Sequence, residues 1–207
     1  MVLAVLAIFV VSYLIGSVNS AIIVGRILSG DDIRNHGSGN AGATNAMRTY
    51  GKAAAAYVTI GDCLKSAISC IIAIIVANVF DYAADKGAIL LYAAGFGAVL
   101  GHNFPIFFGF KGGKGILVSI TALMFADWKI ALLVFVISIT VMAITKYVSL
   151  GSVLGAVLFI VFGLVFRTDN IAYIVYTIVM ALLAIYRHRA NIVRLVQGTE
   201  SKLGQKK

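Results

Sequence analysis

The chain has 207 residues, of which 61% are hydrophobic and only 12% are charged. Soluble domains are about 45–50% apolar and about 25% charged, so this composition is typical of a membrane protein and excludes a disordered chain. The net charge of +9 would indicate a nucleic-acid partner in a soluble protein. In a multispan protein it reports topology instead, so we expect a lipid bilayer around the chain and no nucleic acid.

Seven apolar runs, separated by short polar stretches, predict seven membrane-spanning helices. A span needs about 20 apolar residues, so seven spans leave little sequence for a separate soluble domain. We therefore expect residues 1–207 to form one membrane domain. The first run has no basic start and is too long for a signal peptide, so it is predicted to remain as a helix. The runs cover residues 2–28, 53–79, 88–104, 115–126, 129–145, 148–166 and 170–186.

The run 115–126 is short, since it covers only about 18 Å of a hydrocarbon core about 30 Å thick. The distribution of charge indicates whether it crosses. If all seven runs cross with the N-terminus outside, thirteen Lys and Arg residues lie inside and three outside. If this run only dips into the bilayer, eight lie on each side. The positive-inside rule favours seven crossings, with the N-terminus outside and the C-terminus in the cytoplasm.

Small residues recur every four positions on three of these runs, which predicts close helix contacts. The two cysteines, Cys63 and Cys70, are too far apart along one helix to bridge each other. Neither belongs to a metal-type pattern, so we expect no bound metal. The small-residue rows are Ser12, Gly16 and Ser20; Ala93, Gly97 and Gly101; and Gly151 and Gly155.

With this topology, three polar clusters share the cytoplasmic face, and the outer loops are ordinary turns. The clusters are RNHGSGNAGATNAMR at 34–48, GHNFPIFFGFKGGKG at 101–115 and YRHRANIVR at 186–194. This one-sidedness predicts a functional site at the inner boundary of the bilayer.

The first cluster combines Gly37, Gly39 and Gly42 with several hydrogen-bonding side chains. Glycines let backbone N–H groups turn inward, and such concave nests bind anions. The three glycines also match a dinucleotide fingerprint, but no strand precedes them, so we reject that site. The plainer alternative is a Gly-rich connector between spans, which does not account for the gathering of donors around Arg48.

The second cluster places Lys111 and Lys114 on a flexible backbone. Its spacing fails the Walker pattern, yet ammonium groups and backbone amides can still clamp a phosphate. The alternative is that the two lysines only set topology. His102 is likewise either a substrate contact or a hydrogen-bonded residue of the interface.

In the third cluster, His188 and Asn191 share one face if the last helix continues through them, and so do Asn191 and Arg194. Interfacial anchoring accounts for Arg187 and Arg194 but not for the other two residues. In the second run, Asp62 lies about 13 Å into the apolar layer, and Lys65 follows it on the same helix face. Charges at such depth are costly. Both a structural ion pair and a substrate-orienting pair remain open.

The three clusters, in this order and on this face, resemble those of the bacterial acyl-phosphate-dependent glycerol-3-phosphate acyltransferases, the PlsY family. The similar stretches are GSGNAGATNAMR at 37–48, GHNFPIFFGFKGGKG at 101–115 and YRHRANIVR at 186–194. The resemblance covers essentially the whole chain. It implies transfer of a fatty acyl group from acyl-phosphate to the 1-hydroxyl of sn-glycerol 3-phosphate, giving lysophosphatidic acid and phosphate. It also implies a multi-pass protein of the bacterial inner membrane without a cofactor, and we expect a monomer.

The resemblance also implies roles for individual residues. Ser38, Gly39, Asn40 and Thr44 would cradle a phosphate, with Arg48 adding charge, and Lys114, His188 and Asn191 would hold glycerol 3-phosphate. The residues expected to be catalytic are Ser38, Asn40, Arg48, Lys114 and His188. Those expected to bind substrate are Gly37, Gly39, Thr44, Asn45, Lys65, His102, Lys111, Gly112, Gly113, Arg187, Asn191 and Arg194.

Other mechanisms fit the sequence less well. The HxxxxD motif of other acyltransferases is absent, because no carboxylate stands five residues after any histidine. A metal-dependent phosphotransferase needs several clustered carboxylates, and the inner face offers only Asp31, Asp32 and Glu200. An anion transporter is the alternative from another class, but the outer halves of the spans are nearly all apolar. The family is thought to use a substrate phosphate as proton acceptor, whereas His188 is the base that the residues alone favour.

Overall fold

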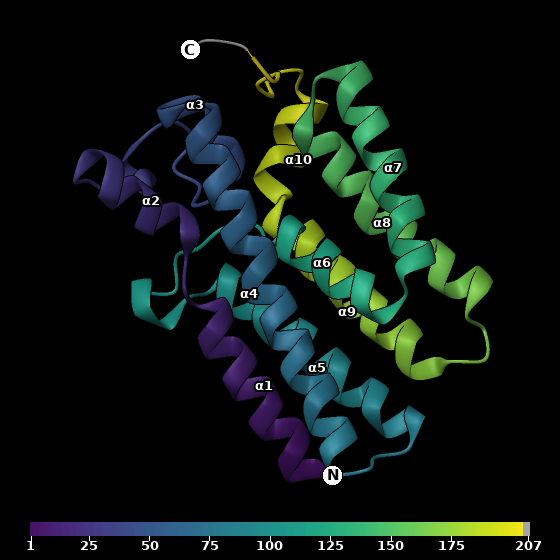
Figure 1. Ribbon diagram of the computed structural model, residues 1–207. Coiled ribbons are helices and arrows are strands. Elements are labelled where there is room, and N and C mark those ends of the chain that lie inside the picture. Colours follow the sequence, from purple (N-terminus) through teal and green to yellow (C-terminus); the bar gives the residue numbers. More distant parts are fainter. Residues whose placement is uncertain (205–207) are drawn as a thin grey trace. The chain divides into compact units, whose positions relative to one another are not determined.

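The computed structural model describes residues 1–204, and every regular element in that range is a helix (Figure 1), which confirms the all-α class. Lys206 and Lys207, which the charge count places inside, lie outside the described residues. The chain packs as two compact units, residues 1–126 and the residues from Asp127 onward.

The first unit contains α1 (Val2–Gly16), α2 (Ser20–Ser29), η1 (Ile33–Asn35), α3 (Ala43–Tyr50), α4 (Lys52–Val79), α5 (Ala84–Asn103), η2 (Ile106–Phe108) and α6 (Ile116–Ala126). The second unit contains α7 (Trp128–Thr145), α8 (Val148–Phe166), α9 (Ile171–Arg187) and α10 (Arg189–Val196).

Among the described residues, five stretches are long and apolar enough to cross a membrane, or six if α9 and α10 count as one bent span. They are Val2–Ser29, Lys52–Val79, Ala84–Phe108, Trp128–Thr145 and Val148–Phe166. The remaining predicted crossing, at 115–126, corresponds to α6. Its 11 residues cover only about 16 Å, so the seventh crossing and the orientation of the termini stay predictions.

The first apolar run is not one helix, contrary to the prediction. It divides into α1 and α2 because Asn19 caps a new helix, its side-chain oxygen accepting the N–H of Ile22 at 3.1 Å. The break takes the carbonyl of Val18 out of the helical pattern, where it accepts a hydrogen bond from Lys65 at 3.0 Å. Ser20 consequently begins α2 and does not extend the small-residue row of α1.

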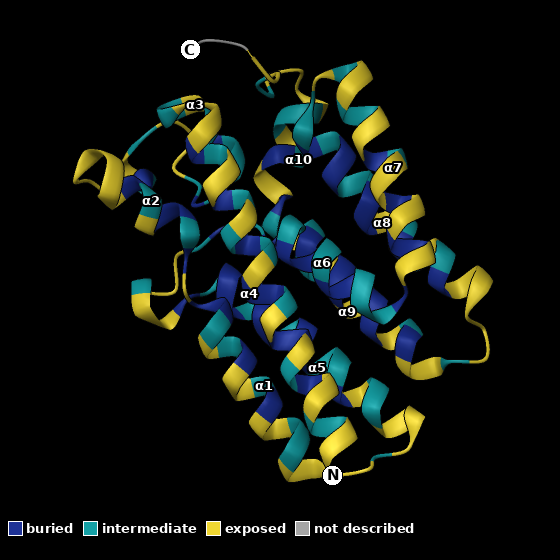
Figure 2. Cartoon of the chain, viewed as in Figure 1, coloured by how far each residue is buried: buried dark blue, intermediate teal, exposed yellow. Residues whose placement is uncertain are grey.

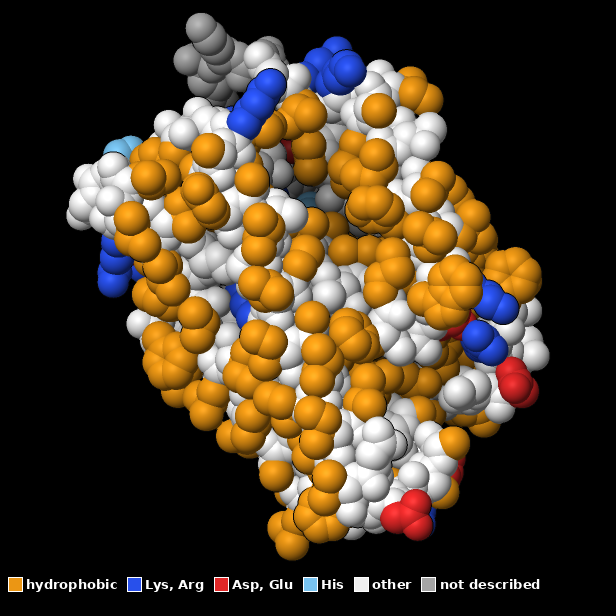
Figure 3. All heavy atoms as spheres, in the orientation of Figure 1, with side chains coloured by type: hydrophobic (Ala, Val, Ile, Leu, Met, Phe, Trp, Pro, Cys, Tyr) orange, Lys and Arg blue, Asp and Glu red, His pale blue; other side chains and the backbone are white. Residues whose placement is uncertain are grey.

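The outward faces of the long helices are apolar. Figure 2 shows exposed residues along α1, α4 and α7, and Figure 3 shows hydrophobic side chains over the same helices. Leu3 on α1 is 83% exposed and Ile75 on α4 is 54% exposed. A bilayer, in contrast to water, imposes no penalty on such surfaces, so they agree with a multi-pass membrane protein.

Within the first unit, α1 and α5 approach closely at their small residues, as predicted. A Cβ atom on Gly16 would overlap the backbone of Ala98, and one on Gly101 would overlap the carbonyl oxygen of Tyr13. A Cβ atom on Gly97 would lie 2.6 Å from the carbonyl oxygen of Phe9. Glycine is therefore required at these contacts because backbone meets backbone.

The second unit repeats this packing between α7 and α8. A Cβ atom on Gly151 would lie 2.6 Å from the carbonyl oxygen of Ser138, and one on Gly155 would lie 2.6 Å from the Ser138 hydroxyl. The predicted small-residue contact of Gly151 and Gly155 is confirmed. Cys63 and Cys70 in the first unit are free thiols, also as predicted.

The glycine contacts generate a prediction on stability. Gly101→Ala forces α1 away from α5 and should destabilise the protein by about 1–3 kcal/mol, the usual cost of overpacking. The control is Gly87→Ala on the same helix, because its new Cβ would meet only the Ala77 methyl at an ordinary 3.4 Å. Thermal unfolding in detergent measures both. An unchanged midpoint for Gly101→Ala would contradict the close approach of the two helices.

Candidate functional site

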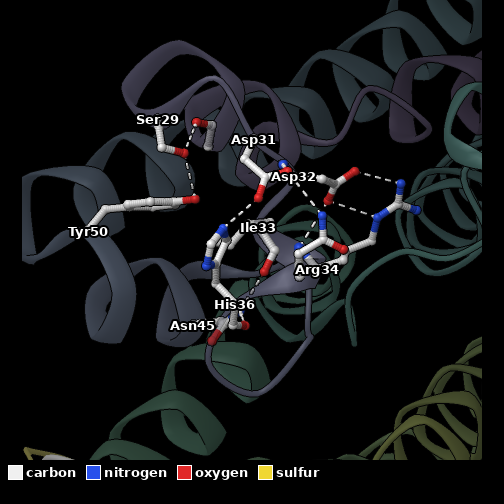
Figure 4. A network of polar contacts seen from close by, with 10 residues as sticks. Ser29, Asp31, Asp32, Ile33, Arg34, His36, Asn45 and Tyr50 are labelled. Atoms are coloured by element: carbon white, nitrogen blue, oxygen red, sulfur yellow. Dashed lines mark hydrogen bonds and ion pairs between the residues drawn. The ribbon is translucent and has the colours of Figure 1, made fainter.

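The buried side chain of Asn45 holds the first glycine-rich loop in shape. Its Oδ1 accepts the N–H of Ser38 at 2.9 Å. Its amide nitrogen donates to the carbonyl oxygens of Ile33 at 3.2 Å and His36 at 3.0 Å. Both amide protons are thus used inside the loop, as Figure 4 shows in part, so Asn45 shapes the loop, and its contact with a substrate stays a prediction.

The turn around Ser38 depends on glycine. Gly37 and Gly39 have φ values of 57° and 71°, the left-handed region that other residues rarely adopt. A side chain on Gly37 would also overlap Oδ1 of Asn45. Because of this turn, Ser38 and Gly39 are exposed at the surface of the first unit.

Two acidic residues stabilise the segment that leads into the same loop. Oδ2 of Asp31 lies 2.8 Å from Nε2 of His36, and both oxygens of Asp32 accept hydrogen bonds from Arg34, at 3.0 and 2.7 Å (Figure 4). The bonds from Arg34 lower the pKa of Asp32 below its ordinary value. Asp32 therefore stays ionised and keeps the guanidinium oriented.

Arg34 connects the first loop to the second. Its Nη1 donates to the carbonyl oxygen of Phe108 at 2.7 Å and to that of Lys111 at 2.9 Å. Phe108 also packs on the core formed by α2, η1 and α3. From the sequence, Arg34 was expected only to contribute to the positive charge of the inner face. The nearby Asp32, with which it forms an ion pair, could have indicated a structural role.

The first loop runs directly into α3, whose N-terminus carries no side-chain cap. The positive end of a helix dipole and its first N–H groups favour a bound anion. Thr44 lies in the first turn of α3, and Arg48 follows one turn later on the same face. The arrangement of Ser38, Gly39, Thr44 and Arg48 is suited to a phosphate group.

The second loop folds back on the end of α5. The N–H of Gly112 donates to the carbonyl of Asn103, and that of Gly113 donates to the carbonyl of His102, both at 3.2 Å. A Cβ atom on Gly113 would overlap Nε2 of His102 and lie 2.6 Å from the carbonyl oxygen of Ala41. The two glycine-rich loops therefore touch, and Lys114 directly follows the point of contact.

A buried polar network lies below the second loop. The ammonium of Lys65 is 3.0 Å from Oδ1 of Asp62 and 2.9 Å from Nδ1 of His102. Ser20 donates to the same Asp62 oxygen at 3.1 Å. This network links α2, α4 and α5 and places Lys65 and His102 face to face within the helices. A contact of either residue with the substrate stays a prediction.

In the second unit, the carboxylate of Glu200 gathers the polar residues of the third cluster. It accepts hydrogen bonds from Asn191 at 2.6 Å, Arg194 at 2.7 Å and Ser149 at 2.8 Å. Burial raises the pKa of Glu200, but these three bonds outweigh it and leave the pKa below its ordinary value. Glu200 was considered before only as a possible metal ligand.

His188 lies where the last apolar segment bends. It ends α9 and begins α10, and the two helices meet at 61°, so the helix does not continue straight as the shared-face argument assumed. Its Nδ1 donates to the carbonyl oxygen of Ala184 at 2.8 Å. In the neutral ring the lone pair is then on Nε2, the atom that can accept a proton.

The structure thus arranges the expected residues in three groups. Ser38, Gly39, Asn40, Thr44 and Arg48 belong to the first loop and α3, and Gly112, Gly113 and Lys114 to the second loop, which touches the first. Lys111 is exposed, and its backbone carbonyl accepts a hydrogen bond from Arg34. His188, Asn191 and Arg194 belong to the second unit together with the half-buried Arg187. The described residues contain no cluster of three or more candidate metal ligands.

These features define a multi-pass membrane protein with paired loops suited to phosphate. A profile of the family described as glycerol-3-phosphate acyltransferase matches residues 6–198. Curated glycerol-3-phosphate acyltransferases from Thermoanaerobacter sp. (strain X514) and Clostridioides difficile (strain 630) are 43% and 42% identical to the chain. The first alignment covers 95% of this chain and 94% of its relative, and the second 96% and 95%.

Solved structures of PlsY, an integral membrane glycerol 3-phosphate acyltransferase, are similar as well. Its glycerol 3-phosphate form aligns with a TM-score of 0.85 and 34% identity over 97% of this chain and 96% of that one. Its lysophosphatidic acid form gives 0.80 and 32% over 97% and 95%. The chain belongs to the PlsY family of glycerol-3-phosphate acyltransferases, which confirms the resemblance.

The Glu200 contacts generate a prediction on stability. Glu200→Gln loses charge-assisted hydrogen bonds, which contribute about 1.5–3 kcal/mol in folded proteins, and should lower the melting temperature at pH 7. Because the folded-state pKa is depressed, the contribution is complete above the ordinary pKa of an unfolded glutamate and disappears as the pH falls through the lower folded-state pKa. The melting temperatures of wild type and variant should therefore converge in acid.

The control for this measurement is Glu200→Asp, which keeps the charge and should keep the pH dependence. Equal melting temperatures for wild type and Glu200→Gln at pH 7 would contradict a stabilising role of the carboxylate.

Proposed function

We propose that the chain transfers a fatty acyl group from acyl-phosphate to the 1-hydroxyl of sn-glycerol 3-phosphate. The hydroxyl oxygen forms a bond to the acyl carbon, and the bond from that carbon to the phosphate oxygen breaks. The products are lysophosphatidic acid and inorganic phosphate, with the hydroxyl proton passing to a proton acceptor. Family membership supports the acceptor substrate, and the loops of the first unit support a reaction between phosphate-bearing molecules.

The observation that carries the proposal is the contact between the two glycine-rich loops at Ala41 and Gly113. The first loop offers the exposed side chain of Ser38 and leads into the uncapped N-terminus of α3, with Arg48 one helical turn beyond Thr44. The second offers Lys114 immediately after the contact. A phosphate held by donors from both loops would have its position fixed by backbone geometry.

Acyl-phosphate is a mixed anhydride with a good leaving group, so the reaction needs no covalent enzyme nucleophile. It needs alignment of the substrates and stabilisation of the negative charge that develops on oxygen. The first N–H groups of α3, together with the Ser38 hydroxyl, Arg48 and Lys114, supply donors of the required kind. Ser38 then acts as a donor and not as an acylated intermediate.

The proton acceptor is, in this proposal, a phosphate of the substrate. The leaving phosphate is adjacent to the reacting hydroxyl, so proton transfer to it needs no further group. His188 then orients glycerol 3-phosphate together with Asn191, a pair that the family resemblance assigns to that substrate. The alternative, His188 as general base, has in its favour that donation by Nδ1 to Ala184 directs the ring lone pair to Nε2.

The membrane context follows from the chemistry of the substrates. Acyl-phosphate carries a long apolar chain and glycerol 3-phosphate is a soluble dianion, so they meet at the boundary of the bilayer. We assign the loops to the cytoplasmic side of a bacterial inner membrane, since the positive-inside count favours that orientation.

The decisive experiment is an acyl-transfer assay with purified protein in lipid nanodiscs. The proposal expects lysophosphatidic acid from acyl-phosphate and glycerol 3-phosphate, with no product from acyl-CoA. Product formed only from acyl-CoA would overturn the assigned donor, and no product from either donor would overturn the reaction. Treatment with a metal chelator should leave the rate unchanged.

Lys114 provides a test of the phosphate contacts. Lys114→Ala removes one charge-assisted contact and should lower kcat/KM about ten- to a hundredfold. Lys52→Ala is the control, because this exposed lysine at the start of α4 lies outside both loops and should leave kcat/KM unchanged. Steady-state kinetics measures both variants. Equal kinetics for the two would remove Lys114 from the site.

A further inference from the structure

We propose that His102 is a positioning residue that fixes the second glycine-rich loop, and that Lys65 and Asp62 set the ring's orientation and tautomer. The inference rests on the proposed function only for what the loop binds. Its structural part concerns a chain of contacts from the middle of α4 to Gly113, and nothing in the family description assigns it.

The first link is the ammonium group of Lys65. It contacts Oδ1 of Asp62 and the carbonyl oxygen of Val18, each at 3.0 Å, and Nδ1 of His102 at 2.9 Å. An ammonium has three protons and no acceptor site, so these contacts use all of its donors. Nδ1 of His102 must therefore accept, which leaves the proton of the neutral ring on Nε2.

The carboxylate of Asp62 favours the tautomer of His102 that carries its proton on Nε2. It lies closer to the ammonium of Lys65, at 3.0 Å, than to Nδ1 of His102, at 3.5 Å. Its Oδ1 also accepts a hydrogen bond from the hydroxyl of Ser20. A proton on Nδ1 would point at the ammonium group, so the opposite tautomer is disfavoured electrostatically.

The second link is the Nε2 edge of the His102 ring. A Cβ atom on Gly113 would overlap Nε2 of His102 and would lie 2.6 Å from the carbonyl oxygen of Ala41, so the ring edge packs directly against Gly113. The backbone of the same histidine accepts the N–H of Gly113 at 3.2 Å. His102 thus holds Gly113 by ring and backbone together, at the contact of the two loops and one residue before Lys114.

Stability alone is a poor reason for such a network. Asp62, Lys65 and His102 are 2%, 5% and 3% exposed within apolar helices. Removing two charges from water costs about as much as their attraction returns, and an apolar replacement is often as stable. What the network provides is a single orientation of one ring, which suits a role in positioning.

The tautomer can be observed directly by ¹⁵N NMR of histidine-labelled protein in detergent. The chain has only three histidines, and His102→Gln identifies the signals of the one in question. We expect a proton on Nε2 and none on Nδ1, and a mixture of tautomers in Lys65→Met. A wild-type ring protonated on Nδ1, or a spectrum that Lys65→Met does not change, would overturn the proposal.

Two matched variants test the effect on the loop. His102→Gln keeps an N–H near the Nε2 position, whereas His102→Asn places its amide near Nδ1 and leaves the Nε2 edge empty. Calorimetric titration with glycerol 3-phosphate should give near-wild-type affinity for Gln and about tenfold weaker affinity for Asn, as expected for one lost contact.

Melting temperatures of the two variants separate positioning from folding. If both variants lose stability while the surviving folded protein binds normally, His102 is only structural and the proposal fails. Equal weakening of glycerol 3-phosphate binding in both variants would contradict the role of the Nε2 edge of His102 in holding Gly113. If wild-type protein binds no glycerol 3-phosphate, the proposed function fails, and the tautomer measurement still decides the structural part.

Discussion

The ammonium group of Lys65 is the interaction on which the first unit depends. In a segment surrounded by lipid, every donor needs a partner inside the protein, because no water is present to replace it. Lys65 meets this requirement by joining three places, the break after α1, the carboxylate of α4 and the imidazole of α5. The break that the Asn19 cap introduces in the first apolar run serves this network, because it leaves the carbonyl of Val18 available to Lys65.

The same constraint explains why the loops above are rigid. The second loop is tied to α5 through Gly112 and Gly113, and Arg34 ties it to the first. Asn45 closes the first loop with three hydrogen bonds of its own. Loops with their backbone fixed in this way hold the side chains that they carry in place before a ligand arrives, which reduces the entropy lost on binding.

Much of this architecture could be predicted from the sequence, because the signals are strong and local. Hydropathy located the long helices, and small residues four apart identified the contact of Gly97 and Gly101 with α1. The polar clusters identified the two loops. These inferences depend on local composition and on the spacing of residues along the chain, and both can be read without knowing the tertiary contacts.

Other features could not be predicted, because they depend on which partner a side chain finds. The capping ability of Asn19 is visible in the sequence, but its use inside an apolar run requires the distant Lys65 as partner for Val18. The sequence likewise does not show that both amide protons of Asn45 bind carbonyl groups of its own loop. Glu200 gave no signal beyond being a carboxylate in a basic tail, and its three donors come from two helices, α8 and α10.

The two units solve the same electrostatic problem with different charges. A site for anionic substrates needs several cations and N–H donors close together. Without partners inside the protein, the cations would repel one another and the buried donors would lack acceptors. In the first unit Asp32 orients Arg34 and Asp62 balances Lys65, so each carboxylate directs a cation toward a loop. In the second unit Glu200 binds Asn191 and Arg194 together. These carboxylates are thus used to hold cations and donors of the protein, and the uncapped N-terminus of α3 carries no acidic side chain that would compete with the substrate's own negative charge.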